Sequence, residues 1–166
     1  MAKDPQRIDY FHLSGASLAP SSIIEPGNWG RVIRAYGWQH NQALREMALE
    51  NARLSGFQHR PSRMDAAFIF VTLDEAQRFR QSVNGFQQHL LYRVTLCNPS
   101  SASHLTDSRL CAPQGTLRHD WATIYWLDVD AQAAAIPGID WAVAVGGVQL
   151  REMLTLSQLR IEERLN

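Results

Sequence analysis

Lysine is almost absent from this chain of 166 residues: Lys3 is the only one, and arginine supplies every other basic side chain. Sixteen basic residues balance sixteen acidic ones, so no net charge draws the protein to nucleic acid or to an anionic membrane. The preference for arginine has two interpretations, which the composition leaves open. It reflects codon bias in a GC-rich genome, or it supplies planar donors for phosphate or carboxylate groups.

Cysteine is also scarce, and long apolar runs are missing. Cys97 and Cys111 are too few for a disulfide framework in a chain of this size. The N-terminal residues MAKDPQRIDYF are polar, unlike a cleavable leader, and no stretch approaches the length of a membrane span. We therefore expect a cytoplasmic protein with no membrane partner, and delivery as an effector without a cleavable leader stays open.

Several catalytic motifs are missing as well. The sequence has no GxSxG nucleophile motif and no P-loop, and Gly146-Gly147 is too short for a dinucleotide-binding fingerprint. Cys97 falls within a predicted strand and has no adjacent basic group to lower its pKa. Neither a serine nor a thiol nucleophile is supported.

The patterns that are present predict an α+β fold, with an N-terminal helical portion packed on a predominantly antiparallel sheet. The length favours one domain over residues 1–166. Alternating or continuous apolar residues predict strands at Ile8–Ser14, Ala66–Val71, His89–Cys97 and Ala122–Val129, and a helix at Gln39–Leu54. Turn-rich and polar residues predict loops at Ala19–Arg31 and Ser100–Asp120. The tail from Val148 fits a strand, and its later part also fits a helix.

The stretch Arg60–Arg80 is the unit around which the chain is organised. An Arg-Pro-Ser-Arg turn leads into the apolar run, and an amphipathic helix follows. Thr72 and Glu75 form a capping box, in which each side chain satisfies a free backbone amide at the helix start. Asp74 in the first turn suits the positive end of the helix dipole.

His12 is the first candidate for chemistry. On a strand, His12 and Ser14 share one face with Tyr10, so an imidazole and a hydroxyl point the same way. They either face a cleft or belong to a half-buried, hydrogen-bonded interior, and the pattern alone leaves both readings open.

Arg60 and Arg63 are the second candidate. Two arginines around a rigid Pro-Ser turn can clamp phosphate oxygens, or they can tie a loop to a carboxylate.

A zinc site is a third candidate. Cys97, His104, Cys111 and His119 are the right residue types, but their spacing lacks the close ligand pairs of zinc fingers and ribbons. We expect no bound metal.

The order of these motifs resembles the ADP-ribosyltransferase superfamily. The resemblance covers roughly residues 8 to 155: a strand with His-x-Ser, a helical segment, and an Arg/Ser-bearing strand that leads into a helix with an acidic-Ala pair. The segments YFH, RPSR, LDEAQRF, YRVTL and YWLDV are also similar to an uncharacterised bacterial family with that pattern. The resemblance implies a split antiparallel sheet and NAD as the substrate.

The resemblance also implies roles for individual residues. His12 and Ser14 would hold NAD through a ribose and the nicotinamide amide, and Arg63, with Arg60 beside it, would hold the diphosphate. An aromatic ring would stack on the nicotinamide, with Phe68 and Phe70 as candidates and Tyr92 as a weaker one.

The chain departs from the superfamily at the catalytic glutamate. In the equivalent segment, DWAVAVGG, Ala142 stands where that glutamate belongs. Asp140 and Glu152 are the carboxylates left to stabilise the oxocarbenium-like state formed when the nicotinamide–ribose bond breaks.

Two functions follow. One is an NAD-binding ADP-ribosyltransferase that modifies a macromolecule, protein or nucleic acid, as a toxin, effector or defence factor. The other is a non-enzymatic nucleotide- or protein-binding module on the same scaffold, favoured by Ala142.

Overall fold

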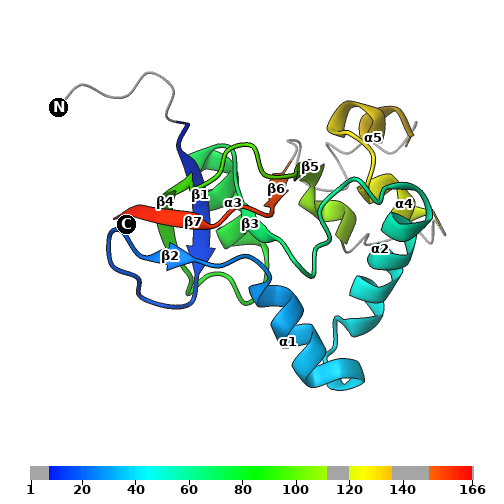
Figure 1. Cartoon of the computed structure of the whole chain (residues 1–166), viewed down its shortest axis with the longest axis horizontal. Coiled ribbons are helices and arrows are strands. Elements are labelled where there is room, and N and C mark those ends of the chain that lie inside the picture. The colour runs from blue at the N-terminus through cyan, green and yellow to red at the C-terminus, as the bar shows by residue number, and fades with distance from the viewer. Residues whose placement is uncertain (1–7, 112–119, 136–149, 166) are drawn as a thin grey trace.

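The structure is a computed structural model that describes residues 8–111, 120–135 and 150–165. It is an α+β protein with two antiparallel sheets (Figure 1). The first sheet has the strand order β1-β4-β7-β2 and the second the order β3-β6-β5. The strands are β1 (Tyr10–Ser14), β2 (Ile23–Ile24), β3 (Ala67–Ile69), β4 (Leu90–Leu96), β5 (Ser103–Asp107), β6 (Arg151–Thr155) and β7 (Leu159–Leu165).

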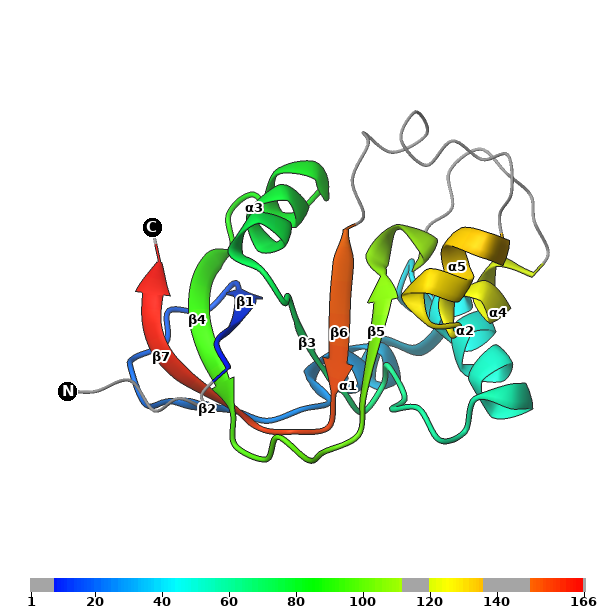
Figure 2. The same ribbon diagram turned by 90° about the horizontal axis from the view of Figure 1, so that it is seen from above.

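Backbone hydrogen bonds between Phe11 and Phe70 join the two sheets at one point. Phe11 N donates to Phe70 O at 3.0 Å, and Phe70 N donates to Phe11 O at 2.8 Å. Beyond this pair β1 and β3 separate, and Figure 2 shows the two sheets as separate walls. We call the place where β1 and β3 separate, next to this pair, the split.

The helices cover the sheets on different sides. They are α1 (Asn28–Tyr36), α2 (Ala43–Gly56), α3 (Leu73–Ser82), α4 (Trp121–Tyr125) and α5 (Val129–Ala135), with short 3-10 turns η1 (Gly37–Gln39) and η2 (Ser108–Cys111). α2, α4 and α5 lie beside the second sheet, whereas α3 lies near β4 (Figure 2). In the described part of the chain, no helix is long and apolar enough to cross a membrane.

Three apolar clusters fill the spaces between these layers. One lies between the second sheet and α2 and α4, with Leu49, Trp126 and Leu154 fully buried. Another lies between the two sheets and includes Ile69 and Tyr92. The third lies under α3 and contains Phe70.

Several predicted elements are confirmed, with shifted ends: the first strand as β1, the helix before the turn as α2, and the central unit as β3 and α3. The capping box is present, since Glu75 N donates to the Thr72 hydroxyl at 3.2 Å. The strand predicted at His89–Cys97 is β4. The ambiguous tail forms two strands, β6 and β7.

Other predictions are wrong. The strand predicted at Ala122–Val129 is α4, a turn and the start of α5. The helix α4 is only five residues long, and its buried residues Ala122, Ile124 and Tyr125 lead directly into buried Trp126, so the segment shows a nearly continuous apolar run and no helical period. The loop predicted at Ala19–Arg31 contains β2 and the start of α1, and the loop at Ser100–Asp120 contains β5 and η2.

Gly30 lets α1 pack directly on the backbone before β3. A Cβ at this position would lie 1.8 Å from the carbonyl oxygen of Met64 and 2.6 Å from its carbonyl carbon. Backbone atoms cannot rotate away, so Gly30→Ala must push α1 outward. We expect the free energy of unfolding to fall by about 1–3 kcal/mol, as for other overpacked sites.

Chemical denaturation with urea measures this loss, and Gly56→Ala is the matched control. A Cβ at Gly56, the last residue of α2, meets no atom within 4 Å. The control should unfold at the wild-type urea concentration or slightly above it, because alanine is the better helix former. A Gly30→Ala protein with an unchanged midpoint would contradict this packing.

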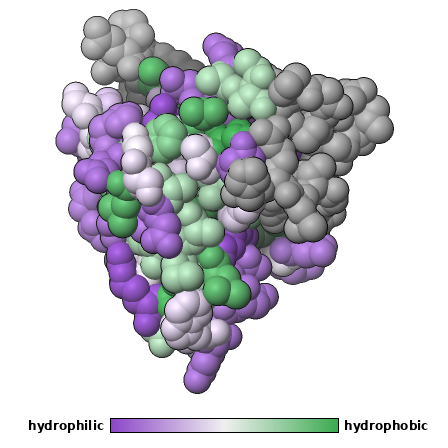
Figure 3. All heavy atoms as spheres, turned by 90° about the vertical axis from the view of Figure 1, so that its right-hand side faces the viewer, coloured by the Kyte–Doolittle hydropathy of each residue, from purple (hydrophilic) through white to green (hydrophobic). Residues whose placement is uncertain are grey.

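The outer surface of α1 and α2 carries exposed apolar side chains. Figure 3 shows the side of the molecule on which α2 lies, with green and pale atoms running down the middle of its described part.

Candidate functional site

His12 lies on β1 at the split, opposite Tyr92 of β4. Its Nδ1 lies 2.8 Å from the carbonyl oxygen of Phe68 on β3. A carbonyl can only accept, so Nδ1 carries the proton and Nε2 is an acceptor in the neutral ring. Burial lowers the pKa of His12, as does nearby His89, while the bond to Phe68 opposes them. No described residue bonds to Nε2. His12 therefore presents an acceptor beside the split.

The other residues predicted to line the NAD site differ in solvent exposure. Ser14 is half-buried, and its hydroxyl accepts from the backbone amide of Ala16 at 3.1 Å. Phe70 is buried under α3, with its ring centroid 5.0 Å from that of Phe79. The Phe70 ring therefore does not face an open cleft, and the prediction that it stacks on a ligand is not supported. Phe68 is half-buried and stays a candidate.

Tyr92, the weaker aromatic candidate, is a structural residue. It is fully buried, and its hydroxyl accepts from Leu18 N at 2.9 Å and donates to Ala16 O at 3.1 Å. It holds the segment that follows β1.

Arg63 is the centre of a buried polar cluster. Its Nε donates to Glu46 of α2 at 2.9 Å, and its Nη1 donates to Glu152 of β6 at 3.0 Å and to the hydroxyl of Tyr125. The guanidinium also lies over the Phe68 ring, 4.8 Å from its centroid. The Tyr125 hydroxyl donates to the same Glu152 oxygen, Oε1, at 3.1 Å.

The pKa values in this cluster follow from burial and charge. Burial raises the pKa of Glu46, but the charges and hydrogen bonds of Arg63 and Arg45 outweigh it, so the net pKa is lowered. The pKa of Tyr125 is raised by burial, although Arg63 opposes this. Burial also raises the pKa of Cys111 to about 12. Cys111 is thus a neutral thiol, not a nucleophile.

Glu152 is anchored through one oxygen only. Oε1 accepts from Arg63, from Tyr125 and, at 3.7 Å, from the Cys111 thiol. Oε2 has no hydrogen-bond partner among the described residues. The carboxylate is therefore fixed in orientation and keeps one oxygen for another group.

A chain of contacts connects His12 to Glu152. His12 bonds to the Phe68 carbonyl, the Phe68 ring lies against Arg63, and Arg63 bonds to Glu152. The strands β1, β3 and β6 are neighbours at the split, which puts the backbones of β1 and β6 roughly 10 Å apart.

The structure does not support the phosphate clamp predicted for Arg60 and Arg63. Arg63 is committed to two carboxylates, and Arg60 donates to Asp128 at 3.1 Å and to Nδ1 of His104. Both arginines tie the turn to carboxylates, which is the alternative that the sequence left open.

The remaining candidates fall elsewhere. Asp140, Ala142 and His119 lie outside the described residues. Cys97 is exposed and Cys111 is buried beside Glu152. Among residues 8–111, 120–135 and 150–165, no three His, Cys, Asp or Glu side chains gather as metal ligands.

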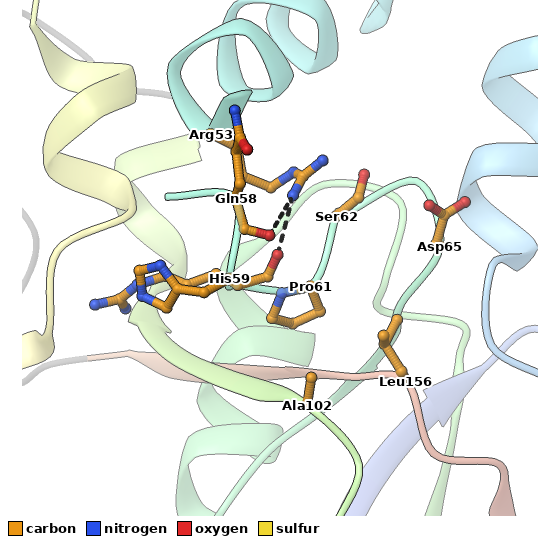
Figure 4. A pocket seen from close by; sticks show the side chains of 9 residues that line it. Arg53, Gln58, His59, Pro61, Ser62, Asp65, Ala102 and Leu156 are labelled. Carbon is orange, nitrogen blue, oxygen red and sulfur yellow. Dashed lines mark hydrogen bonds between the residues drawn. The ribbon is translucent and has the colours of Figure 1, made fainter. Parts of the chain in front are cut away.

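A hollow of about 240 Å³ lies beside the Arg-Pro-Ser-Arg turn (Figure 4). It is lined by Arg53, Gln58, His59, Arg60, Pro61, Ser62, Asp65, Ala102 and Leu156. Arg53 donates to the carbonyls of Gln58 and Arg60, at 3.2 and 3.1 Å, across its upper side. Neither His12 nor Glu152 lines this hollow, so it is separate from the predicted NAD site.

Sequence reasoning missed Glu46 and Tyr125. Glu46 lies on the buried face of α2, one turn before Leu49. Tyr125 lies in the segment that the sequence predicts as a strand. A carboxylate on the inner face of a helix was the available signal, because such a group needs a buried partner.

The chain matches no protein-family model and no curated protein.

Proposed function

We propose that this protein binds NAD at the split between its sheets and acts as an ADP-ribosyltransferase-like enzyme on a macromolecular acceptor. The observation that carries the proposal is Glu152, a carboxylate held through Oε1 with Oε2 left without a partner in the described chain. His12 supports it, because its neutral ring offers Nε2 as an acceptor for a ribose hydroxyl. The two antiparallel sheets also support the proposal, because the resemblance implies a sheet divided in two.

In this proposal the two residues act at different stages. His12 orients the bound dinucleotide in the ground state. When the bond between nicotinamide and ribose breaks, nicotinamide leaves with the electron pair and positive charge develops on the ribose. The Glu152 carboxylate stabilises that charge, and an acceptor nucleophile or water completes the transfer. Glu152 is assigned this role because its carboxylate is held through Oε1 while Oε2 has no partner in the described chain, and Asp140 is the alternative.

A pair of substitutions tests the assignment. His12→Ala should weaken NAD binding up to about tenfold, because it removes one hydrogen bond. Glu152→Gln should leave NAD binding within about twofold and lower nicotinamide release by roughly a hundredfold, because the charge acts in the transition state. Calorimetry measures the binding, and chromatography measures the released nicotinamide.

His40→Ala is the control for His12→Ala. His40 is a half-buried histidine packed against Trp29, away from the split, so NAD binding should not change. A wild-type protein that does not bind NAD would refute the proposal. If Asp140→Ala abolishes nicotinamide release and Glu152→Gln does not, the catalytic carboxylate is Asp140.

The second candidate is a binding module without catalysis. It is favoured by the burial of Glu152 and by the three donors that already occupy Oε1. Tight NAD or ADP-ribose binding with no nicotinamide release, in the wild type as in Glu152→Gln, would select this alternative.

A further inference from the structure

Helix α2 has two different faces. Its inner face packs on the second sheet and α4 through Leu49, whose carbonyl accepts from the Trp126 indole at 2.7 Å. The outer face bears Leu44, Met47, Asn51 and Leu54, all exposed. We call these four residues the α2 seam.

The spacing within the α2 seam is that of a helix that pairs with another helix. Steps of three, four and three residues put Leu44 and Asn51 at equivalent positions of a heptad, with Met47 and Leu54 at the other. A single asparagine among apolar residues is the feature that sets register and partner number in such pairs. Ala43 and Ala48 flank the seam, and their small side chains let a second helix approach closely.

Two exposed aromatic residues lie shortly before α2 in the chain. Trp38 of η1 is 72% exposed and Tyr36 of α1 is 60% exposed, while Leu44, Met47 and Leu54 are 66%, 44% and 48% exposed. Given about 150–250 Å² for each aromatic side chain and about 100 Å² for each of Leu and Met, the exposed fractions of these five residues add to roughly 500 Å² of apolar-rich surface. One partner in a stable interface contributes about 800 Å², including its polar rim. The area therefore suits an interface.

The charges beside the α2 seam are already paired within the chain. Arg45 bonds to Glu46 and Arg53 bonds to Glu50, each at 2.7 Å. The surface thus presents no excess charge that would select an oppositely charged partner, and two copies would not repel each other. The helix is formed before pairing, so association does not have to order it.

We infer that the α2 seam is the interface of a symmetric homodimer in which the α2 helices of two copies pair side by side. Two-fold symmetric dimers bury the same patch of both copies. The pairing is parallel, because Asn51 then meets Asn51 of the second copy, and an amide both donates and accepts. In an antiparallel pair Asn51 would face Met47 and lose its partner.

Sedimentation of the full chain at micromolar concentrations tests the inference. The wild type should sediment at twice the mass of one chain, and Leu44→Glu should sediment as a monomer with its NAD binding unchanged. Ile8→Glu is the matched control: Ile8 is 64% exposed, like Leu44, but lies outside the α2 seam, so this protein should stay dimeric. A monomeric wild type, or a dimer that Leu44→Glu leaves intact, overturns the inference.

A cysteine at position 51 tests the orientation. In a Cys97→Ser background, which removes the exposed thiol, Asn51→Cys should form a disulfide between the two copies on mild oxidation. Equivalent positions of a parallel pair bring the Cα atoms within disulfide range, which is at most about 7 Å. A dimer that is dissociated by Leu44→Glu but never cross-linked through position 51 would overturn the parallel pairing.

Discussion

Arg63→Met is expected to lower the free energy of unfolding by about 3–5 kcal/mol, the loss typical of breaking a buried ion pair. Methionine keeps the aliphatic stem and removes the guanidinium group, so the loss combines the broken ion pairs with the small cavity that the group leaves. Glu46 and Glu152 would remain buried, and the hydrogen bonds they accept from Arg63 would be gone. Equilibrium denaturation at pH 7 measures the loss.

Arg34→Met is the matched control. Arg34 also pairs with a carboxylate at 2.9 Å, but its side chain is 57% exposed and that of Asp65 is 60% exposed. Exposed pairs contribute about 0–1 kcal/mol, so this variant should unfold close to the wild type. Equal losses in the two variants would contradict the buried cluster.

The pH dependence of Arg63→Met gives a second readout. In the wild type the pKa of Glu46 lies below its ordinary value of 4.5, so its contribution to stability is present above that pH and is lost as the pH falls through the lowered pKa. Without Arg63, only Arg45 opposes the effect of burial, so the pKa of Glu46 rises relative to that in the wild type. The folded variant therefore loses less stability on acidification than the wild type does, and its deficit relative to the wild type should shrink as the pH falls below about 5.

Acidification should destabilise the wild type through His104. This histidine is buried and stacked on Trp126, with ring centroids 5.5 Å apart. Its Nε2 lies 3.1 Å from the Tyr125 carbonyl, so Nε2 carries the proton, and Nδ1 accepts from Arg60. A second proton on Nδ1 would face the guanidinium.

Burial, reinforced by Arg60 and His59 and opposed by the Tyr125 carbonyl and Asp128, lowers the pKa of His104 from 6.5 to about 4. The unfolded chain takes up a proton on His104 below pH 6.5, whereas the folded chain does not do so until about pH 4. Stability is therefore lost as the pH falls through this window, by roughly 3 kcal/mol.

His104→Gln removes this titration and keeps a donor for the Tyr125 carbonyl. Between pH 7 and pH 4, the free energy of unfolding of the variant should fall by roughly 3 kcal/mol less than that of the wild type. His59→Gln, at an exposed histidine, should follow the wild-type curve. Identical pH dependence in the wild type and His104→Gln would show that His104 is not buried as described.

The candidate site was predicted only in part. His-x-Ser alternation placed His12 and Ser14 on one face of a strand, and the structure puts that strand at the split. The sequence predicts Glu152 as one of two candidate carboxylates, but nothing near Glu152 in the sequence indicates its partner Arg63, which is 89 residues away. The role of Arg63 was left open because a guanidinium binds phosphate and carboxylate with the same fork of donors.

The sequence by itself determined the elements whose signals are local. The capping box at Thr72 defined the start of α3, and strict alternation defined β1 and β4, because each signal acts within a few residues. Only the tertiary structure decided that Ala122–Val129 is largely helical, since the helix α4 has only five residues and is too short to show a helical period in the sequence. Only the tertiary structure decided which carboxylates surround Arg63. Burial removes water from that group, and the folded chain must bring the compensating charges from α2 and β6, far apart in sequence.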